Sequence, residues 1–218
     1  MDNFEVLEKL GEYGAQFVVL DSLYWIHFCE CREYVIVHIN MDGGCIIQMD
    51  DFEVLQKLGE DGAQGVVSLV EFPNGLRSAM KQFKKTKSTA RIQQEADFQQ
   101  KAADAGIAPP VMHVDLANRR IFMEPMQSRV VDVLKKGYEK FKQDLLHIMQ
   151  TLDELNILHN DGNALNLMLD YNDHLQIIDF GLAKKISPTV RKKWKGEPNV
   201  KVTLFMMKKG LRKYGIHV

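Results

Sequence analysis

The strongest constraint on the fold is a phrase that occurs twice in the chain, at a constant offset of 48 positions. Residues 4–19 read FEVLEKLGEYGAQFVV, and residues 52–67 read FEVLQKLGEDGAQGVV. Counted from the methionine before each copy, 15 of 19 positions are identical. Each copy places glycines between stretches of strand-forming residues, a pattern typical of two strands joined by a glycine-bearing turn. The sequence therefore predicts the same strand–turn–strand at two places.

Length and composition limit the kind of protein that surrounds this repeat. The chain has 218 residues, which fits one domain or one domain built from two lobes. Hydrophobic residues make up 45% and charged residues 26%, as in globular proteins with a substantial core. No apolar run reaches the roughly 18 residues of a transmembrane helix, and the acidic N-terminus is unlike a signal peptide. We therefore expect no membrane-spanning segment.

The three cysteines, Cys29, Cys31 and Cys45, are confined to the first 48 residues. An odd, clustered count argues against a disulfide framework and favours a reducing, cytoplasmic compartment. With His27 and His38 the cysteines have a spacing that matches no common zinc template, so we favour free thiols in an apolar strand pair.

The net charge of −1 conceals a strong asymmetry. From Lys184 to Val218 there are 11 Lys and Arg residues and one acidic residue, Glu197, so this segment carries +10 and the remainder −11. Two interpretations of residues 184–213 stay open. The segment is either a solvated helix face and loop, or a contact surface for an acidic protein, a phosphate-rich substrate or nucleic acid.

The first part of the chain has the periodicity of strands. A strand pair is expected within residues 20–48, where aromatic and β-branched residues alternate with polar ones. Residues 51–125 predict three strands, one helix and two strands. The helix is expected to begin at the Ser88 cap and to end at Gly106.

Beyond these strands the pattern becomes helical. Residues 138–156 carry apolar side chains spaced by three and four, which predicts one buried face. These are Phe141, Leu145, Ile148, Leu152 and Leu155. Two short strands bracketing polar loops come next, and then a basic loop and a helix near residues 204–214.

Five features that bear on chemistry succeed one another along these elements. They are the glycine loop (Gly59, Gly62, Gly65, then Val67), Ala79 and Lys81 on the next strand, Glu95 in the helix, H-x-D-x-x-x-x-N (His159, Asp161, Asn166), and D-F-G from Asp179. Each feature alone is weak, because glycine loops are common and D-F-G occurs by chance. All five in this order, each on the expected element, form a specific pattern.

With these motifs, residues 51–185 resemble the eukaryotic-type protein kinase superfamily. The shortness is similar to reduced members such as the RIO kinases, the small kinase of the KEOPS complex, and kinases of large DNA viruses and bacterial effectors. The resemblance implies an α+β, two-lobed fold with a β-rich N-lobe, 49–126, and a truncated, mainly helical C-lobe, 127–218. Residues 1–48 would be an extension with a degenerate copy of the glycine-loop strand. A viral or effector protein would act in the host cytoplasm or nucleus.

The resemblance also implies an activity, the transfer of a phosphoryl group from ATP, with Mg²⁺, to a protein substrate, expected at Ser or Thr. Asp161 would be the catalytic base, and Asn166 and Asp179 the ligands of Mg²⁺. Lys81 would contact the α- and β-phosphates, and Glu95 would hold it in place. Glycines allow backbone N–H groups to approach the phosphates. The remaining contacts, around the adenine, fall to Val67, Ala79, Met123 as gatekeeper, and Glu124 and Met126 in the hinge. His159 is expected to pack and to form hydrogen bonds.

The sequence departs from the family pattern in the loops. Glu60 stands where the first glycine of G-x-G-x-x-G belongs, which suggests a one-residue insertion or bulge after Gly59. Asn160 replaces the arginine of H-R-D, and Asn163 stands where Ser/Thr kinases usually carry a lysine toward the γ-phosphate.

Two further departures concern packing and substrate docking. Gln99 occupies an apolar position of the helix, so either Phe98 packs there after a rotation or the contact is weakened. There is no A-P-E, and 37 residues follow Gly181. Two alternatives therefore stay open, a nucleotide-binding pseudokinase or adaptor and a small-molecule kinase.

The first copy of the repeat lacks the residues of a nucleotide site. Phe17 takes the place of Gly65, and by the same offset Cys31 and Glu33 take the places of Ala79 and Lys81. We expect one working loop, in the second copy. The first copy is then either a remnant without function or a hairpin that extends the sheet or covers the nucleotide site.

Overall fold

The computed structural model describes residues 6–10, 15–20, 23–27, 34–37, 51–59, 62, 64–134 and 140–218, with side chains from residue 51 onward. Its internal contacts divide it into two compact units. One comprises residues 1–53 with 71–76, and the other comprises residues 54–70 with 77–218. Each unit is described by itself, and the boundary predicted at residue 48 stays a prediction.

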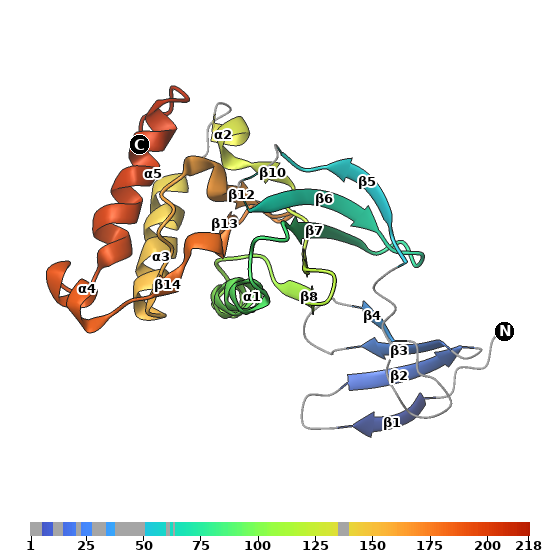
Figure 1. The fold of residues 1–218 in the computed structure, drawn as a ribbon. Helices are drawn as coiled ribbons and strands as arrows, with labels where there is room; N and C mark the ends of the chain where they lie inside the picture. The colour runs from blue at the N-terminus through green and yellow to red at the C-terminus, as the bar shows by residue number, and fades with distance from the viewer. Residues whose placement is uncertain are drawn as a thin grey trace. The chain divides into compact units, whose positions relative to one another are not determined.

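The first unit contains an antiparallel meander of four strands. In order they are β1 (Val6–Leu10), β2 (Ala15–Leu20), β3 (Leu23–His27) and β4 (Tyr34–Val37) (Figure 1). The pair β1–β2 confirms the strands predicted in the first copy, and β3–β4 confirms the strand pair predicted after it. The three cysteines, and with them the question of a zinc site, lie outside the described residues.

The second copy opens a five-stranded sheet with the order β5-β6-β7-β9-β8. The strands are β5 (Glu53–Lys57), β6 (Gly65–Glu71), β7 (Arg77–Phe83), β8 (Val111–Asp115) and β9 (Arg120–Met123). The F-P-N-G turn joins β6 to β7, where the Phe72 N–H donates to the Leu76 carbonyl at 2.9 Å. All five strands were predicted, because period-two alternation and turn residues coincide here.

Helix α1 (Thr89–Ala103) follows β7 and contacts β8 and β9. Ser88 caps it by accepting a hydrogen bond from the Arg91 N–H, as predicted. The helix itself ends at Ala103. Gly106, whose φ is +75°, donates its N–H to the Ala103 carbonyl. Ile92 and Ala96 pack with side chains of β7 and β9 in one apolar cluster, which fixes the helix to the sheet.

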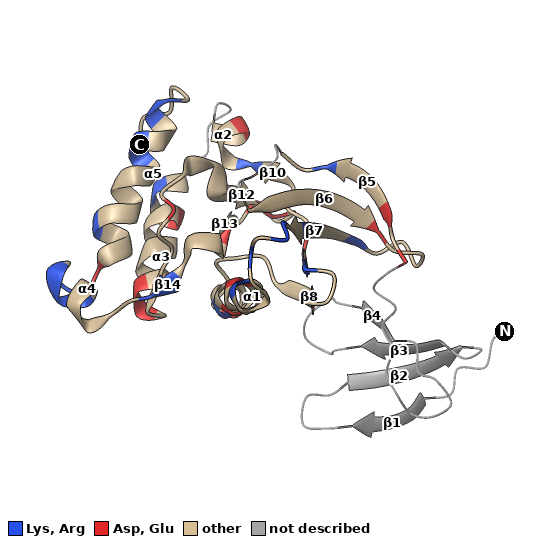
Figure 2. Ribbon diagram, in the orientation of Figure 1, with Lys and Arg blue, Asp and Glu red and all other residues tan. Residues whose placement is uncertain are grey.

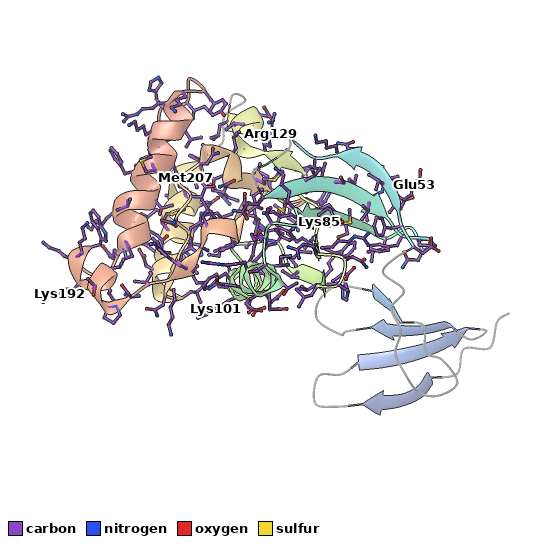
Figure 3. All side chains as sticks on the ribbon, in the orientation of Figure 1. Glu53, Lys85, Lys101, Arg129, Lys192 and Met207 are labelled. Carbon is purple, nitrogen blue, oxygen red and sulfur yellow. The ribbon has the colours of Figure 1, made fainter. Side chains whose placement is uncertain are left out.

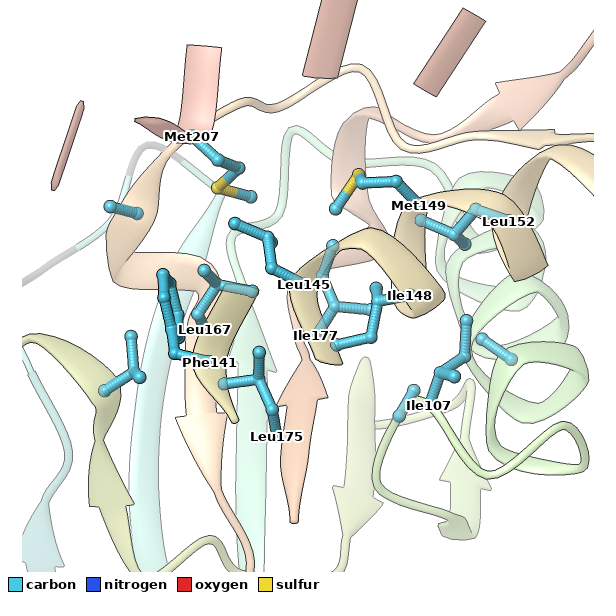
Figure 4. Packing of buried hydrophobic residues seen from close by; sticks show 14 of the residues in the cluster. Ile107, Phe141, Leu145, Ile148, Met149, Leu152, Leu167, Leu175, Ile177 and Met207 are labelled. Atoms are coloured by element: carbon cyan, nitrogen blue, oxygen red, sulfur yellow. The ribbon is translucent and has the colours of Figure 1, made fainter. Parts of the chain in front are cut away.

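The helical part of the chain contains the main core. Its elements are β10 (Ser128–Arg129), α2 (Val130–Val133), α3 (Phe141–Glu154), β11 (Ile157–Leu158), β12 (Leu167–Leu169), β13 (Leu175–Ile177), β14 (Lys184–Lys185), α4 (Pro188–Lys193) and α5 (Leu204–Arg212). Figure 4 shows Phe141, Leu145 and Ile148 of α3 packed with Leu175 and Ile177 of β13. Burial of each such side chain stabilises the fold by about 1.5–3 kcal/mol.

The basic segment has more regular structure than the sequence predicted. Helix α4 lies within the predicted basic loop, so that prediction was wrong for these residues. The sequence does contain a helix-start signal here, because Ser187 caps the helix and Pro188 takes its first position. A π-helical turn, Asn199–Thr203, leads into α5, which was predicted.

The structure shows how α1 accommodates Gln99 at a position where an apolar residue was expected. Its side chain is buried and donates to the Pro109 carbonyl at 3.0 Å, and Phe98 is partly buried against the main core. The helix therefore keeps position 99 inward, and a hydrogen bond replaces the apolar contact. Across the described ranges of the chain, no helix is both long and apolar enough to cross a membrane.

Candidate active site

Lys81 joins three elements that are far apart in the sequence. Its ammonium lies 2.6 Å from Oε1 of Glu95 on α1 and 2.8 Å from Oδ1 of Asp179, two residues after β13. The side chains of Lys81 and Glu95 are 9% and 4% exposed, whereas that of Asp179 is 41% exposed. The structure thus brings together the predicted lysine, its predicted partner and the predicted aspartate of D-F-G.

The opposite charges of Lys81 and Asp179 each favour the ionised form of the other. Burial by itself lowers the pKa of the Lys81 ammonium, but the carboxylates of Glu95 and Asp179 outweigh it and raise the pKa. Burial by itself raises the pKa of the Asp179 carboxyl, but the Lys81 ammonium outweighs it and lowers the pKa. Both groups are therefore charged at neutral pH.

The turn at Asp179 has an uncommon backbone. Asp179 has φ +64°, in the left-handed region, and its carboxylate accepts from the Gly181 N–H at 3.3 Å. Phe180 is buried and meets the His159 ring edge-on, with centroids 5.0 Å apart. The hydrogen bond from Gly181 and the packing of the next residue, Phe180, against His159 accompany this uncommon conformation, which is frequent at functional sites.

His159 connects the two polar loops of the site. It is fully buried, with Nε2 3.1 Å from the Ile178 carbonyl and Nδ1 3.2 Å from the Asp161 carbonyl. Burial lowers the pKa of His159, so the ring is neutral and carries one N–H donor. His159 is thus the packing and hydrogen-bonding residue that the sequence predicted.

Residues of the H-x-D-x-x-x-x-N motif lie beside the segment that leads to Asp179. The Asn166 carbonyl accepts from the Ile178 N–H at 2.9 Å. Asp161 is half-buried. Asn163 caps the following 3₁₀ turn, where its side chain accepts from the Leu165 N–H at 3.0 Å. Asp161 and Asn166 are therefore linked to Asp179 through His159 and Ile178, whereas Lys81 contacts Asp179 directly.

The residues predicted around the adenine lie on β6, on β7, and at or just after the end of β9. Ala79 on β7 is buried and pairs with Met123 on β9, whose carbonyl accepts from the Ser78 hydroxyl at 2.8 Å. The Glu124 N–H bonds to the Pro110 carbonyl at 3.1 Å. Val67 and Met126 are half-buried. Strand pairing therefore fixes Ala79 and Met123 side by side, and their contact with an adenine stays a prediction.

The glycine loop depends on the absence of a side chain at one position above all. Gly65 lies so close to the Gln82 carbonyl that a Cβ atom would collide with backbone. The Gly62 N–H donates to the Gly65 carbonyl at 3.0 Å, and Gly59 has φ +84°. Glu60 lies outside the described residues, so the predicted bulge stays a prediction.

The family model described as the protein kinase domain matches residues 52–203 of the sequence. The chain belongs to the protein kinase superfamily. Its fold is the two-lobed α+β kinase fold. Membership supports phosphotransferase activity in general, with ATP as a substrate, usually a divalent metal, and proteins as acceptors. The match begins within the second copy of the repeat and excludes the first.

The kinase residues also fit a bound divalent cation. The Asp179 carboxylate and the Asn166 amide offer hard oxygen ligands, which Mg²⁺ prefers, and Mg²⁺ usually keeps waters and nucleotide phosphates as further ligands. Asn166 is buried, and its amide nitrogen has no hydrogen-bond partner among the described residues. The same part of the chain holds no group of three or more His, Cys, Asp or Glu side chains that could bind a metal alone. Phosphates would therefore have to complete the coordination.

Two residues that the sequence did not single out, Asn199 and Asp153, hold the loop that begins at His159. The side-chain oxygen of Asn199 accepts from the backbone N–H of His159 at 3.2 Å. Its side-chain nitrogen donates to the Ile157 carbonyl and to Oδ1 of Asp153. The side chains of Asn199 and Asp153 are both buried. No local pattern marks Asn199 as functional, because its partners come from residues some 40 positions earlier.

Helix α5 packs on the same loop. Gly162 lies against the Met206 side chain, where a Cβ would collide, and a Cβ at Gly210 would lie 3.3 Å from the Ala164 methyl group. Small residues thus allow close approach from both sides. Phe205 and Met206, on the first turn of α5, are the two large hydrophobic side chains of this helix that are exposed.

A hollow of about 390 Å³ lies elsewhere, between the start of β5 and the β6–β7 turn. Acidic side chains of Asp51, Glu53 and Glu71 line it. An acidic wall repels phosphates, so this hollow does not suit a nucleotide.

Proposed function

We propose that the chain is an ATP- and Mg²⁺-dependent protein kinase that phosphorylates hydroxyl groups, expected to be those of Ser and Thr. The observation that carries the proposal is the contact of Lys81 with both Glu95 and Asp179, at 2.6 and 2.8 Å. Active protein kinases require the lysine–glutamate pair and the aspartate of D-F-G to be in place together. In this chain Lys81 makes both contacts.

The roles of the residues follow from their chemistry. Lys81 binds the α- and β-phosphates, and Glu95 keeps its ammonium in position. Asp161 accepts or orients the proton of the acceptor hydroxyl, and its backbone carbonyl lies 3.2 Å from Nδ1 of His159. Asn166 and Asp179 hold Mg²⁺, which neutralises charge on the phosphates when it is bound. Val67 and the hinge region contact the adenine.

The test uses the purified full chain with ATP, Mg²⁺ and a mixture of proteins rich in Ser and Thr. Phosphate transfer is followed by mass spectrometry, which also identifies the acceptor. Asp161→Asn is expected to lower turnover by about a thousandfold with nearly unchanged ATP affinity, because only the proton acceptor is lost. Asp173→Asn, in an exposed turn, is the matched control. Full transfer by Asp161→Asn contradicts this mechanism.

One observation favours a second candidate, a nucleotide-binding adaptor that acts by shape. Asn163 supplies no charge where a lysine is usual, and its side chain is used to cap a turn. An adaptor would be stabilised by Mg-ATP in a thermal unfolding experiment but would transfer phosphate to no protein. Transfer to a small molecule in the same assay would instead indicate a small-molecule kinase.

The basic segment supplies a proposed docking surface for an acidic protein substrate. Figure 2 shows Lys and Arg gathered on α4 and α5. Arg191 is an exception, because its guanidinium bonds to the Gly196 and Asp153 carbonyls and therefore serves the fold. Replacing Lys192 and Lys193 by Gln should raise the KM for an acidic protein at low salt and leave the KM for ATP unchanged. Binding to nucleic acid with equal salt dependence would point to the other partner class.

A further inference from the structure

Glu95 binds a second lysine besides Lys81. Lys87, in the turn before α1, places its ammonium on Oε2 of Glu95, while Lys81 takes Oε1. The Lys87 side chain is only 12% exposed, and its ammonium lies 4.7 Å from the centre of the Phe83 ring. A buried ammonium is costly unless it is paired, so its position is defined by these partners.

The same ammonium reaches the glycine loop. Lys87 donates to the side-chain oxygen of Gln64, the residue before Gly65. The Gln64 backbone carbonyl also accepts from the Lys84 N–H at 3.0 Å. The loop is therefore attached to the turn at residues 84–87 by one side-chain contact and one backbone contact.

Gln64 in turn lies on the D-F-G turn. A Cβ at Gly181 would collide with the Gln64 side-chain amide. A continuous series of contacts thus runs from Glu95 through Lys87 and Gln64 to Gly181. Glu95 already holds Lys81, so the glycine loop and the phosphate-binding lysine are anchored on one carboxylate.

We propose that Lys87 is a positioning residue for phosphate binding, which holds the glycine loop over the D-F-G turn through Gln64. This inference rests on the proposed nucleotide site. Loop residues that are already in place lose less conformational freedom when phosphates bind, so affinity is higher. Lys87 also brings a second positive charge to a site in which Asn163 supplies none.

The first experiment compares two ligands of the full chain, ATP with Mg²⁺ and adenosine, which has no phosphates. Lys87→Met should weaken ATP binding about tenfold, as expected for loss of a charged hydrogen bond, and should leave adenosine binding unchanged. Lys87→Arg should restore most of the affinity. Lys85→Met is the matched control, because Lys85 is exposed in the same turn (Figure 3).

A double-mutant cycle tests the route through Gln64. Gln64→Leu should weaken ATP binding about as much as Lys87→Met, and the double variant should bind no more weakly than either single variant. Additive losses, equal losses for ATP and adenosine, or an ATP affinity of Lys87→Met equal to that of Lys85→Met would each overturn the inference.

A second readout does not need the nucleotide. Hydrogen exchange of a peptide spanning residues 58–66 should be faster in Lys87→Met and Gln64→Leu than in the wild type and in Lys85→Met. Unchanged exchange overturns the inference. If the wild-type chain binds no ATP, the proposed function is contradicted instead. The hydrogen-exchange rates would still show whether Lys87 holds the loop.

Discussion

The two copies of the repeat differ less in themselves than in the strands that come after them. Both form a pair of hydrogen-bonded strands, β1–β2 and β5–β6. The first copy continues into β3, which reads Leu-Tyr-Trp-Ile-His, and the second continues into β7, which carries Lys81. The repeated phrase therefore specifies a strand–turn–strand, and the elements after it decide whether a site forms.

The same two regions correct one expectation from the sequence. The constant offset predicted that Cys31 and Glu33 stand in the places of Ala79 and Lys81. The offset fails after the second strand, because β3 begins at Leu23, directly after a short turn, whereas β7 begins at Arg77 after a longer one. The counterpart of β7 is β3, and it too lacks a lysine.

The largest effect is expected from making the two copies alike at position 65. Gly65→Phe introduces the residue that stands at position 17, and its Cβ would collide with the Gln82 carbonyl. We expect nucleotide binding to be lost and the free energy of unfolding to fall by about 3 kcal/mol, since overpacking forces the backbone apart. Calorimetric titration and denaturant unfolding measure the two effects.

The reciprocal change is the control. Phe17→Gly should create no second nucleotide site, and the stoichiometry should stay at one nucleotide per chain. A second binding event in Phe17→Gly would break the comparison, because it would show that the phrase alone suffices.

The next effect concerns the partner that only the second copy acquires. Glu95→Gln removes the carboxylate that holds Lys81 and Lys87. Turnover should fall about a hundredfold, as for loss of one preorganised charge, and stability should fall by about 2 kcal/mol. Asp97→Asn, on the exposed face of the same helix, should change neither. Steady-state kinetics that show equal turnover in both variants would contradict the role of Glu95.

A smaller effect should appear in the pH dependence of stability. Burial lowers the pKa of His159 below its ordinary 6.5, so the unfolded chain binds the proton more readily. The contribution of His159 to the free energy of unfolding is therefore fully present above pH 6.5. It is lost as the pH falls through that value toward the pKa of His159 in the folded protein. Asp179, whose pKa is lowered below 3.8, responds only in stronger acid.

Unfolding midpoints at several pH values between about 5 and 8 test this assignment. His159→Gln should flatten the decrease below pH 6.5, and His147→Gln, on an exposed position of α3, should leave it as in the wild type. An unchanged slope in His159→Gln would assign the decrease to other groups.

Most of the fold could be predicted because its elements have local signals. Alternation marked β6 and β7, spacing by three and four marked α3, and Ser88 marked the start of α1. Helix α4 also had a signal, at Ser187–Pro188, but the density of positive charge favoured the interpretation as a loop.

The site was predictable only in part. Lys81 and Asp179 are 98 positions apart, so the order of known motifs, and not periodicity, brought them together. The contact between Lys87 and Gln64 spans 23 positions, and that between Asn199 and His159 spans 40. No motif of the family names these residues, and only tertiary structure reveals them.

The smallest effect is expected from removing the first copy altogether. All residues proposed for the site fall in the unit formed by residues 54–70 and 77–218, whereas residues 1–53 belong to the other unit. A chain of residues 49–218 should therefore bind one nucleotide with an affinity within about twofold of the full chain and with equal turnover, because no site interaction is removed. Titration calorimetry and kinetics on both chains measure this. A tenfold loss of affinity in a folded, soluble 49–218 chain would show that the first copy acts on the nucleotide site, which would favour a covering hairpin over a remnant.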